Sequence, residues 1–90
     1  MAELFETSQY KKDLKRIKRR NLDINKLKIL IRLLLVKKKL PEKYKQHILK
    51  GNWHGYYECH IEPDWLLIYL WVGDILKLIR TGSHAELLKK

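Results

Sequence analysis

The sequence predicts an α+β domain with the order strand, two helices, three antiparallel strands and a short C-terminal helix. In the first half of the chain, apolar residues recur every three or four positions, which is the period of an amphipathic helix. After Gly51, apolar or alternating segments are separated by turn residues, as in antiparallel strands. Near the end, Ser83 is followed three positions later by Glu86, which is the pattern of a helical capping box.

Two helices are expected after a short first strand at residues 2–6. Thr7 or Ser8 suits the N-cap of the first helix, whose apolar positions are Tyr10, Leu14 and Ile17. Asp23 suits the N-cap of the second helix, whose apolar stripe comprises Ile24, Leu27, Leu30, Ile31 and Leu34. Lys37, Lys38 and Lys39 close this helix, where cations suit its negative end, and Pro41 prevents its continuation. The short link between the helices predicts a helical hairpin that covers one face of a sheet.

Three strands are expected at residues 53–62, 65–72 and 75–81, after a loop at 40–51 with a short edge strand around Ile48. Pro63-Asp64 and Gly73-Asp74 form the turns between them. Before Pro63 the residues alternate, so His60 shares one strand face with Glu58 and Glu62. From Trp65 onwards both faces are apolar, which is typical of a central strand covered on both sides. A histidine, a carboxylate and an aromatic residue therefore meet at one hairpin end.

Positive charge is concentrated in the first half of the chain. The net charge is +10 overall; residues 1–50 contain 16 Lys and Arg against 5 Asp and Glu, whereas residues 51–90 contain 4 against 5. A run of charge on a helix is commonly only a solvated face. However, nine Lys and Arg fall within residues 11–28, more than solubility requires, which favours a polyanionic partner.

Other features exclude several classes. The single cysteine, Cys59, rules out an intramolecular disulfide and a cysteine pair for zinc, and it is expected in the core. The apolar segment 27–36 is interrupted by Lys28 and Arg32 and is about half the roughly 20 residues needed to cross a bilayer. The N-terminus lacks the pattern of a signal peptide, so we expect a cytoplasmic protein. No cofactor is expected.

Four segments carry a resemblance to a known family: Tyr44-Lys45-Gln46-His47, Leu49-Lys50-Gly51-Asn52-Trp53, Glu58-Cys59-His60-Ile61-Glu62-Pro63-Asp64-Trp65 and Arg80-Thr81-Gly82-Ser83-His84-Ala85-Glu86-Leu87. In order and spacing they resemble the YafQ family of the RelE/ParE toxin superfamily, and the resemblance covers nearly the whole chain. It implies a single domain at residues 1–90 with a RelE-like fold: an antiparallel sheet, a helical hairpin on one face and a short C-terminal helix. It also implies a ribosome-dependent endoribonuclease that cuts mRNA and inhibits translation.

The resemblance further implies site residues and partners. The family's active-site positions correspond to His47, His60, Asp64 and His84, with Trp65 as a further site residue. Leu88 stands where the family often has an aromatic residue. The implied partners are an acidic antitoxin of the DinJ/RelB type, the ribosome with its mRNA, and operator DNA through the antitoxin complex.

The residues themselves suit this chemistry. Metal-independent RNA cleavage needs a base for the ribose 2′-hydroxyl, an acid for the departing 5′-oxygen and positive charge for the transition state. His47, His60 and His84 suit proton transfer, Asp64 suits an orienting or basic role, and Arg80 and Lys50 supply charge. Trp65 is expected to be partly core and partly cleft wall. The basic residues expected to bind RNA on the first helix are Lys11, Lys12, Lys15, Arg16 and Arg19.

Alternatives remain at this stage. Each histidine could be structural, and for His54 that interpretation is preferred. A zinc site of His47, His60, Asp64 and His84 is less favoured, because no two of these residues show the i, i+4 helical spacing of a strong zinc motif. A toxin of the same superfamily with a non-nuclease target such as gyrase, or a basic nucleic-acid-binding module without catalysis, would not need this histidine set.

Overall fold

The computed structural model describes residues 2–88 of the chain, with side chains to Leu87. A five-stranded sheet has the order β1-β5-β4-β3-β2. Its elements are β1 (Glu3–Glu6), α1 (Ser8–Arg19), α2 (Ile24–Leu35), β2 (His47–Ile48), β3 (Tyr57–Glu62), β4 (Trp65–Val72), β5 (Ile75–Gly82) and α3 (His84–Leu88), with single 3₁₀ turns η1 (Glu42–Tyr44) and η2 (Gly51–Trp53). The predicted α+β class is confirmed. The sheet is not wholly antiparallel, because β1 pairs with β5 in parallel.

The helices are positioned by the caps that the sequence indicates. The Thr7 hydroxyl oxygen accepts a hydrogen bond from the Tyr10 N–H at 3.2 Å, and the hydroxyl donates to the Leu78 carbonyl of β5 at 2.9 Å. Asp23 caps α2 by accepting from the Asn25 N–H at 3.0 Å. Thr7 thus both starts α1 and ties it to the sheet. The second helix ends before the three lysines expected to close it, and Lys37 then has a left-handed backbone with φ of +57°.

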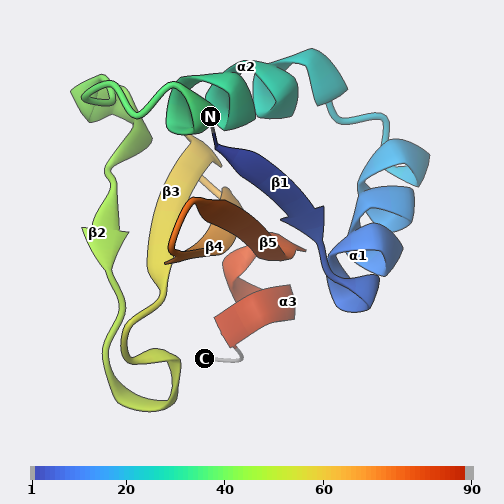
Figure 1. The fold of residues 1–90 in the computed structure, drawn as a ribbon. Helices are drawn as coiled ribbons and strands as arrows, with labels where there is room; N and C mark the ends of the chain where they lie inside the picture. The colour runs from blue at the N-terminus through green and yellow to red at the C-terminus, as the bar shows by residue number, and fades with distance from the viewer. Residues whose placement is uncertain (1, 89–90) are drawn as a thin grey trace.

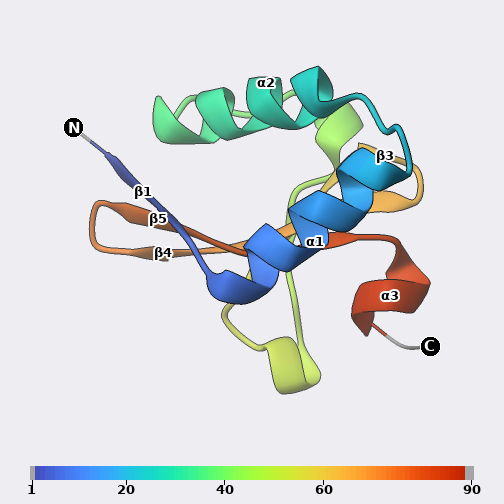
Figure 2. The same ribbon diagram turned by 90° about the vertical axis from the view of Figure 1, so that its right-hand side faces the viewer.

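Two apolar layers lie on opposite faces of the sheet. Figures 1 and 2 show α2 over one face and α3 on the opposite side, with α1 beside the β1–β5 end. The layer beneath α1 and α2 includes Ile17, Leu27, Leu30, Leu67 and Leu78, and Cys59 is buried in it as expected. The smaller layer on the α3 side is built from Leu66, Ile68 and Leu87, with Trp53 and Tyr56 from the η2 region. Among the helices described, none is long and apolar enough to cross a membrane.

The boundaries of the later strands differ in two places from the prediction. The strand expected from residue 53 begins at Tyr57, because Gly51–Trp53 forms a 3₁₀ turn and Gly55 follows with φ of +90°. The expected edge strand is present as β2 and pairs with β3. The strand β4 has the predicted bounds, and β5 extends one residue further, to Gly82.

A buried carboxylate joins α1 to β5. Asp13 is 0% exposed and accepts hydrogen bonds from Arg80 Nε at 2.7 Å, Arg16 Nη2 at 3.0 Å and the Thr81 N–H at 3.2 Å. Burial alone would raise the pKa of the Asp13 carboxyl, but the hydrogen bonds from Arg80 and Thr81 and the Arg80 charge hold it below its usual value. Arg16 continues the network to Glu86 of α3 at 2.9 Å. This network fixes the chain on both sides of the β5–α3 junction.

Replacing Asp13 by alanine is expected to lower the free energy of unfolding by about 2–4 kcal/mol, because it leaves the Arg80 guanidinium without its buried partner. Urea denaturation measures the loss. Asp74→Ala, which breaks an exposed ion pair with Lys37, is the control and is expected to lower the free energy of unfolding far less, because solvent screens this pair. Since the folded-state pKa of Asp13 is depressed, its contribution is present above about pH 4 and is lost as the pH falls further. Equal losses in the two variants would contradict this role.

Candidate active site

Five side chains from four parts of the chain meet on the α3 side of the sheet. We call His47, Glu58, His60, Asp64 and His84 the histidine cluster. The register of β2 on β3 places His47 opposite Glu58, and the alternation of β3 places Glu58 and His60 on the same face. Asp64 lies in the β3–β4 turn, and His84 begins α3. The ring centroids of His60 and His84 are 5.4 Å apart, and those of His47 and His60 are 6.2 Å apart.

Glu58 holds two of the histidines through one oxygen. Its side chain is 4% exposed, and Oε1 lies 3.2 Å from His47 Nε2 and 3.0 Å from His60 Nε2. The other ring nitrogen of His47, Nδ1, lies 2.8 Å from the Lys45 carbonyl oxygen. A carbonyl only accepts, so Nδ1 carries a proton. Both nitrogens of His47 therefore face acceptors, which is the arrangement that suits an imidazolium cation.

Asp64 holds the third histidine from the other side. Its Oδ1 accepts from the backbone N–H of His84 at 2.9 Å and lies 2.7 Å from His84 Nδ1. The backbone hydrogen bond from His84, followed by the imidazole hydrogen bond, lowers the pKa of the Asp64 carboxyl. An ionised Asp64 accepts a hydrogen bond from the N–H at Nδ1 of His84. The other ring nitrogen of His84, Nε2, is then left for proton transfer. The side chains of both residues are well exposed to solvent, so a substrate can reach them.

Part of the cluster has the donors of a metal site. One ligand atom each from Glu58, His60 and His84 lies within 4.8 Å of the other two. Imidazole nitrogen and carboxylate oxygen suit zinc and copper. This set differs from the four residues considered from sequence, since Glu58 takes part while His47 and Asp64 do not.

The structure places two of the predicted RNA-binding residues, Trp65 and Arg80, in positions that differ from the prediction. Trp65 is 2% exposed, and its indole N–H donates to Thr81 Oγ1 at 3.0 Å, so it is a core residue with no free aromatic face for RNA. Arg80, expected to bind phosphate, pairs instead with Asp13. Both residues support the strands that carry the histidine cluster.

The remaining predicted RNA contacts lie outside the cluster. Lys11, Lys12, Lys15 and Arg19 are exposed on α1, and Lys50 is exposed before η2. Arg16 is partly engaged with Asp13 and Glu86. The side chain of Leu88 lies outside the described part of the chain. His54 is exposed after η2, away from the hydrogen bonds of the cluster.

Sequence reasoning missed Glu58 as a site residue. The alternation of β3 indicated that it shares a face with His60, but burial and the pairing with His47 depend on β2, a strand of only two residues. A carboxylate two positions from a histidine on a strand is commonly solvated. The missing information was that the short edge strand places a second histidine directly opposite this carboxylate.

Comparisons with known proteins agree with this fold. The family described as bacterial toxin of type II toxin-antitoxin system, YafQ, matches residues 2–89. The mRNA interferase toxin YafQ of Escherichia coli K12 is 48% identical over 82 residues, 90% of this chain and 89% of the relative. A chain of the E. coli DinJ-YafQ complex has a TM-score of 0.89 at 42% identity, covering 97% of this chain and 98% of that chain. The copper-bound L66S mutant toxin from Helicobacter pylori has a TM-score of 0.92 at 38% identity, covering 97% and 99%.

The fold and the site together define a small α+β protein that carries a cluster of three histidines and two carboxylates on the α3 side of its sheet. The family match then identifies which kind of small α+β protein this chain is. The chain belongs to the YafQ family of toxins from bacterial type II toxin–antitoxin systems. The resemblance inferred from its histidine and turn segments is thereby confirmed.

The pairing of Asp64 with His84 can be tested by titration. In His84→Ala the pKa of Asp64 is expected to rise towards its ordinary value, but only in part, because the backbone N–H of residue 84 remains as a donor. Carbon-13 NMR of the Asp64 carboxyl measures the change. The control is His54→Ala, which removes an exposed histidine and is expected to leave the titration unchanged. An identical titration in wild type and His84→Ala would contradict the pairing.

Proposed function

We propose that this toxin is an mRNA interferase, an endoribonuclease that cleaves mRNA on the ribosome by acid–base chemistry without a metal ion. The observation that carries the proposal is the histidine cluster, in which three imidazoles from separate elements are oriented by two carboxylates on an accessible face. Family membership supports it, and the E. coli relative carries the name mRNA interferase toxin.

The reaction is a transesterification followed by product release. The ribose 2′-oxygen attacks the adjacent phosphorus as a base removes its proton. The bond from phosphorus to the 5′-oxygen then breaks as an acid protonates that oxygen, leaving a 2′,3′-cyclic phosphate and a 5′-hydroxyl. Acid–base catalysis of this kind contributes roughly 10²–10⁴-fold to the rate. His60 and His84 each have one ring nitrogen held by a carboxylate and the other left for proton transfer.

His47 suits the third requirement of the reaction, which is positive charge. Its Nδ1 faces the Lys45 carbonyl and its Nε2 lies 3.2 Å from Glu58 Oε1, so these surroundings suit a positively charged ring. An imidazolium next to the two proton-transfer groups favours the doubly charged phosphorane over the singly charged substrate. This replaces the role that sequence reasoning gave to Arg80.

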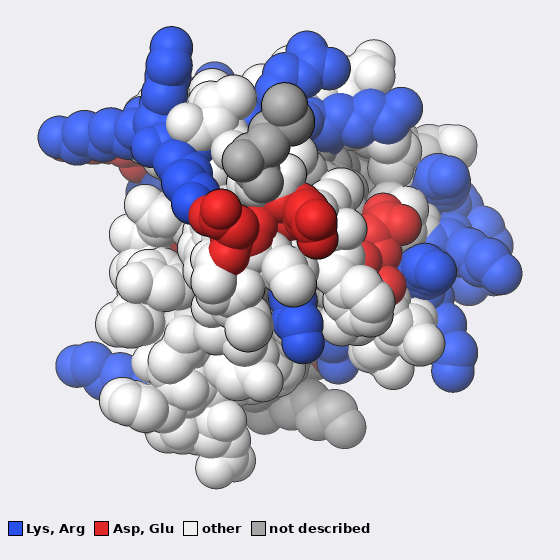
Figure 3. Space-filling model, in the orientation of Figure 1, with Lys and Arg blue, Asp and Glu red and all other residues white. Residues whose placement is uncertain are grey.

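The basic helices supply the affinity for the ribosome. Figure 3 shows Lys and Arg gathered around the rim of the molecule, over α1 on the right and along α2 at the top. We propose that Lys11, Lys12, Lys15 and Arg19, all exposed on α1, contact ribosomal RNA, with Lys50 as a further contact. Such binding weakens as salt concentration rises. The same positive charge suits binding of an acidic antitoxin of the DinJ type. The solved E. coli relative is in a complex with DinJ.

We further propose that the toxin acts in the cytoplasm, where ribosomes translate, as one domain over residues 1–90. Operator DNA is reached through the antitoxin complex and not by the toxin alone. These assignments follow from the proposed ribosomal target.

Replacing His60 or His84 by alanine is expected to reduce single-turnover cleavage of a defined mRNA on programmed ribosomes by at least about 10²-fold. Glu58→Gln is expected to reduce it by roughly tenfold or more, because His47 and His60 lose their common acceptor. His54→Ala is the matched control and should cleave as the wild type does. Full cleavage by the His60→Ala, His84→Ala double variant would leave a binding module or a non-nuclease toxin as the function.

A bound divalent metal is expected to inhibit this reaction. Zinc or copper on Glu58, His60 and His84 would bind both imidazoles that transfer protons and hold them away from the substrate. Adding Zn²⁺ should therefore lower cleavage, with the inhibition weakened in Glu58→Gln, in which one ligand loses its charge. Isothermal titration of the toxin with Zn²⁺ gives the stoichiometry independently of ribosomes. Stimulation by Zn²⁺ would show that the metal-free mechanism is wrong.

A further inference from the structure

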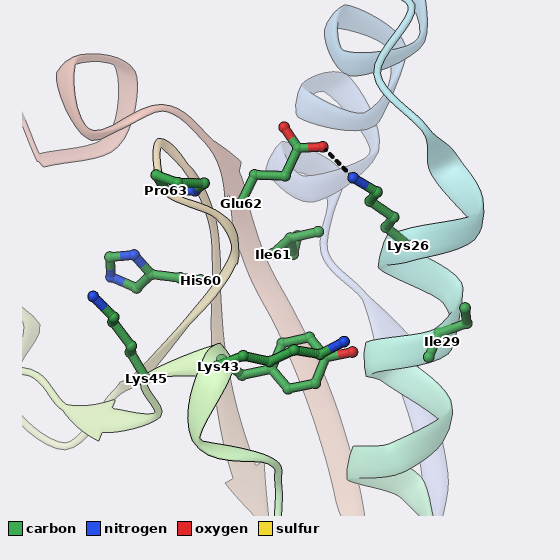
Figure 4. A pocket seen from close by; sticks show the side chains of 9 residues that line it. Lys26, Ile29, Lys43, Lys45, His60, Ile61, Glu62 and Pro63 are labelled. Carbon is green, nitrogen blue, oxygen red and sulfur yellow. Dashed lines mark hydrogen bonds and ion pairs between the residues drawn. The ribbon is translucent and has the colours of Figure 1, made fainter.

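A hollow of about 390 Å³ opens beside the histidine cluster, between α2, η1 and the β3–β4 hairpin (Figure 4). Three of its lining side chains are cationic: Lys26, Lys43 and Lys45. His60, Ile61 and Pro63 form the side contributed by the hairpin. We call this the lysine hollow. His60 lines the hollow and also belongs to the histidine cluster, so the two adjoin at this residue of β3.

The hollow has an excess of positive charge. Lys26 lies at the end remote from His60 and is paired with Glu62, with Nζ 2.9 Å from Oε2 (Figure 4). Within residues 2–87, Lys43 and Lys45 form no ion pair, and both are exposed. Lys43 Nζ lies 5.2 Å from the centroid of the Tyr44 ring, an arrangement that keeps the ammonium group over an aromatic face. Lys45, beside His60, and Lys43, on the α2 side of the hollow, are thus available to an anion (Figure 4).

Lys45 is also fixed by its backbone. It has φ of +46°, in the left-handed region, and its N–H donates to the Glu42 carbonyl at 2.9 Å. Its own carbonyl oxygen lies 2.8 Å from His47 Nδ1. The residue that presents a cation to the hollow therefore also orients a histidine of the candidate active site. A ligand bound by the Lys45 ammonium group would therefore have a fixed position relative to His47 and the rest of the histidine cluster.

We propose that the lysine hollow binds the nucleotide of the mRNA strand next to the scissile phosphate. Lys45, beside His60, and Lys43, toward α2, contact two successive phosphodiesters of the strand, while Ile61 and Pro63 pack against the base or ribose between them. The volume is within the range of about 300–1,000 Å³ that small-molecule sites have. Lysine contacts to phosphate position a strand without reading its sequence. This inference rests on the proposed mRNA cleavage and adds the site that aligns the strand.

The test compares two pairs of lysines that lose the same charge. Lys43→Gln/Lys45→Asn empties the hollow of its unpaired cations, and asparagine tolerates the left-handed backbone at position 45. Lys38→Gln/Lys39→Gln is the control, since both lysines are exposed and lie outside the hollow. Single-turnover cleavage of a defined mRNA on programmed ribosomes is measured against toxin concentration at several salt concentrations.

The hollow variant is expected to need roughly tenfold more toxin for half-maximal cleavage than the control variant. The slope of log affinity against log salt should fall by about 1.4, or about 0.7 for each single-strand phosphate contact. Lys43→Gln alone, which leaves the backbone of Lys45 untouched, should lower the slope by about 0.7. Equal behaviour of the hollow and control variants, with cleavage by the wild type intact, would overturn the inference alone. No cleavage by the wild type would overturn the proposed function as well.

Discussion

The buried carboxylate of Glu58 is the interaction on which the site depends. Glu58 is the second residue of β3 and is 3% exposed, and one of its oxygens contacts a histidine from the edge strand and a histidine of its own strand. Burying an unpaired carboxylate is unfavourable, so the two imidazole rings beside Glu58 stabilise its side chain. The second oxygen, Oε2, finds no hydrogen-bond partner among the described residues. A buried oxygen without a hydrogen-bond partner lowers the stability of the fold. This loss of stability is consistent with a residue that serves the chemistry of the site.

A second carboxylate, Asp13, fixes the opposite end of the site. It binds Arg80 and the Thr81 N–H of β5, and Arg16 extends the contact to Glu86 of α3. Glu86 in turn accepts from the Ser83 N–H at 2.9 Å, at the point where α3 begins. His84 follows directly. The basic helix α1 therefore contributes in two ways: its buried face positions the β5–α3 junction, and its exposed face carries the charge proposed to bind RNA.

Much of the fold could be predicted because local patterns determine it. The caps at Thr7 and Asp23, the turns at Pro63-Asp64 and Gly73-Asp74, and the apolar run of β4 depend only on neighbouring residues. The parallel pairing of β1 with β5 could not be predicted, since it joins residues about 70 positions apart. Dependence on residues far apart in the sequence also explains why parts of the site could not be predicted. Composition and family resemblance selected the histidines, but the burial of Glu58, the capture of Arg80 by Asp13 and the placement of Trp65 in the core all depend on long-range packing.

The central claim is that the toxin activates the ribose 2′-hydroxyl of mRNA with its own side chains. The most direct measurement replaces the ribose on the 5′ side of the mapped cut by 2′-deoxyribose in an otherwise identical mRNA, presented on programmed ribosomes. The account predicts that cleavage at this position is lost, while the unmodified message yields a 2′,3′-cyclic phosphate. Cleavage of the deoxy-substituted message at the same position would contradict the account, because the nucleophile would then be water.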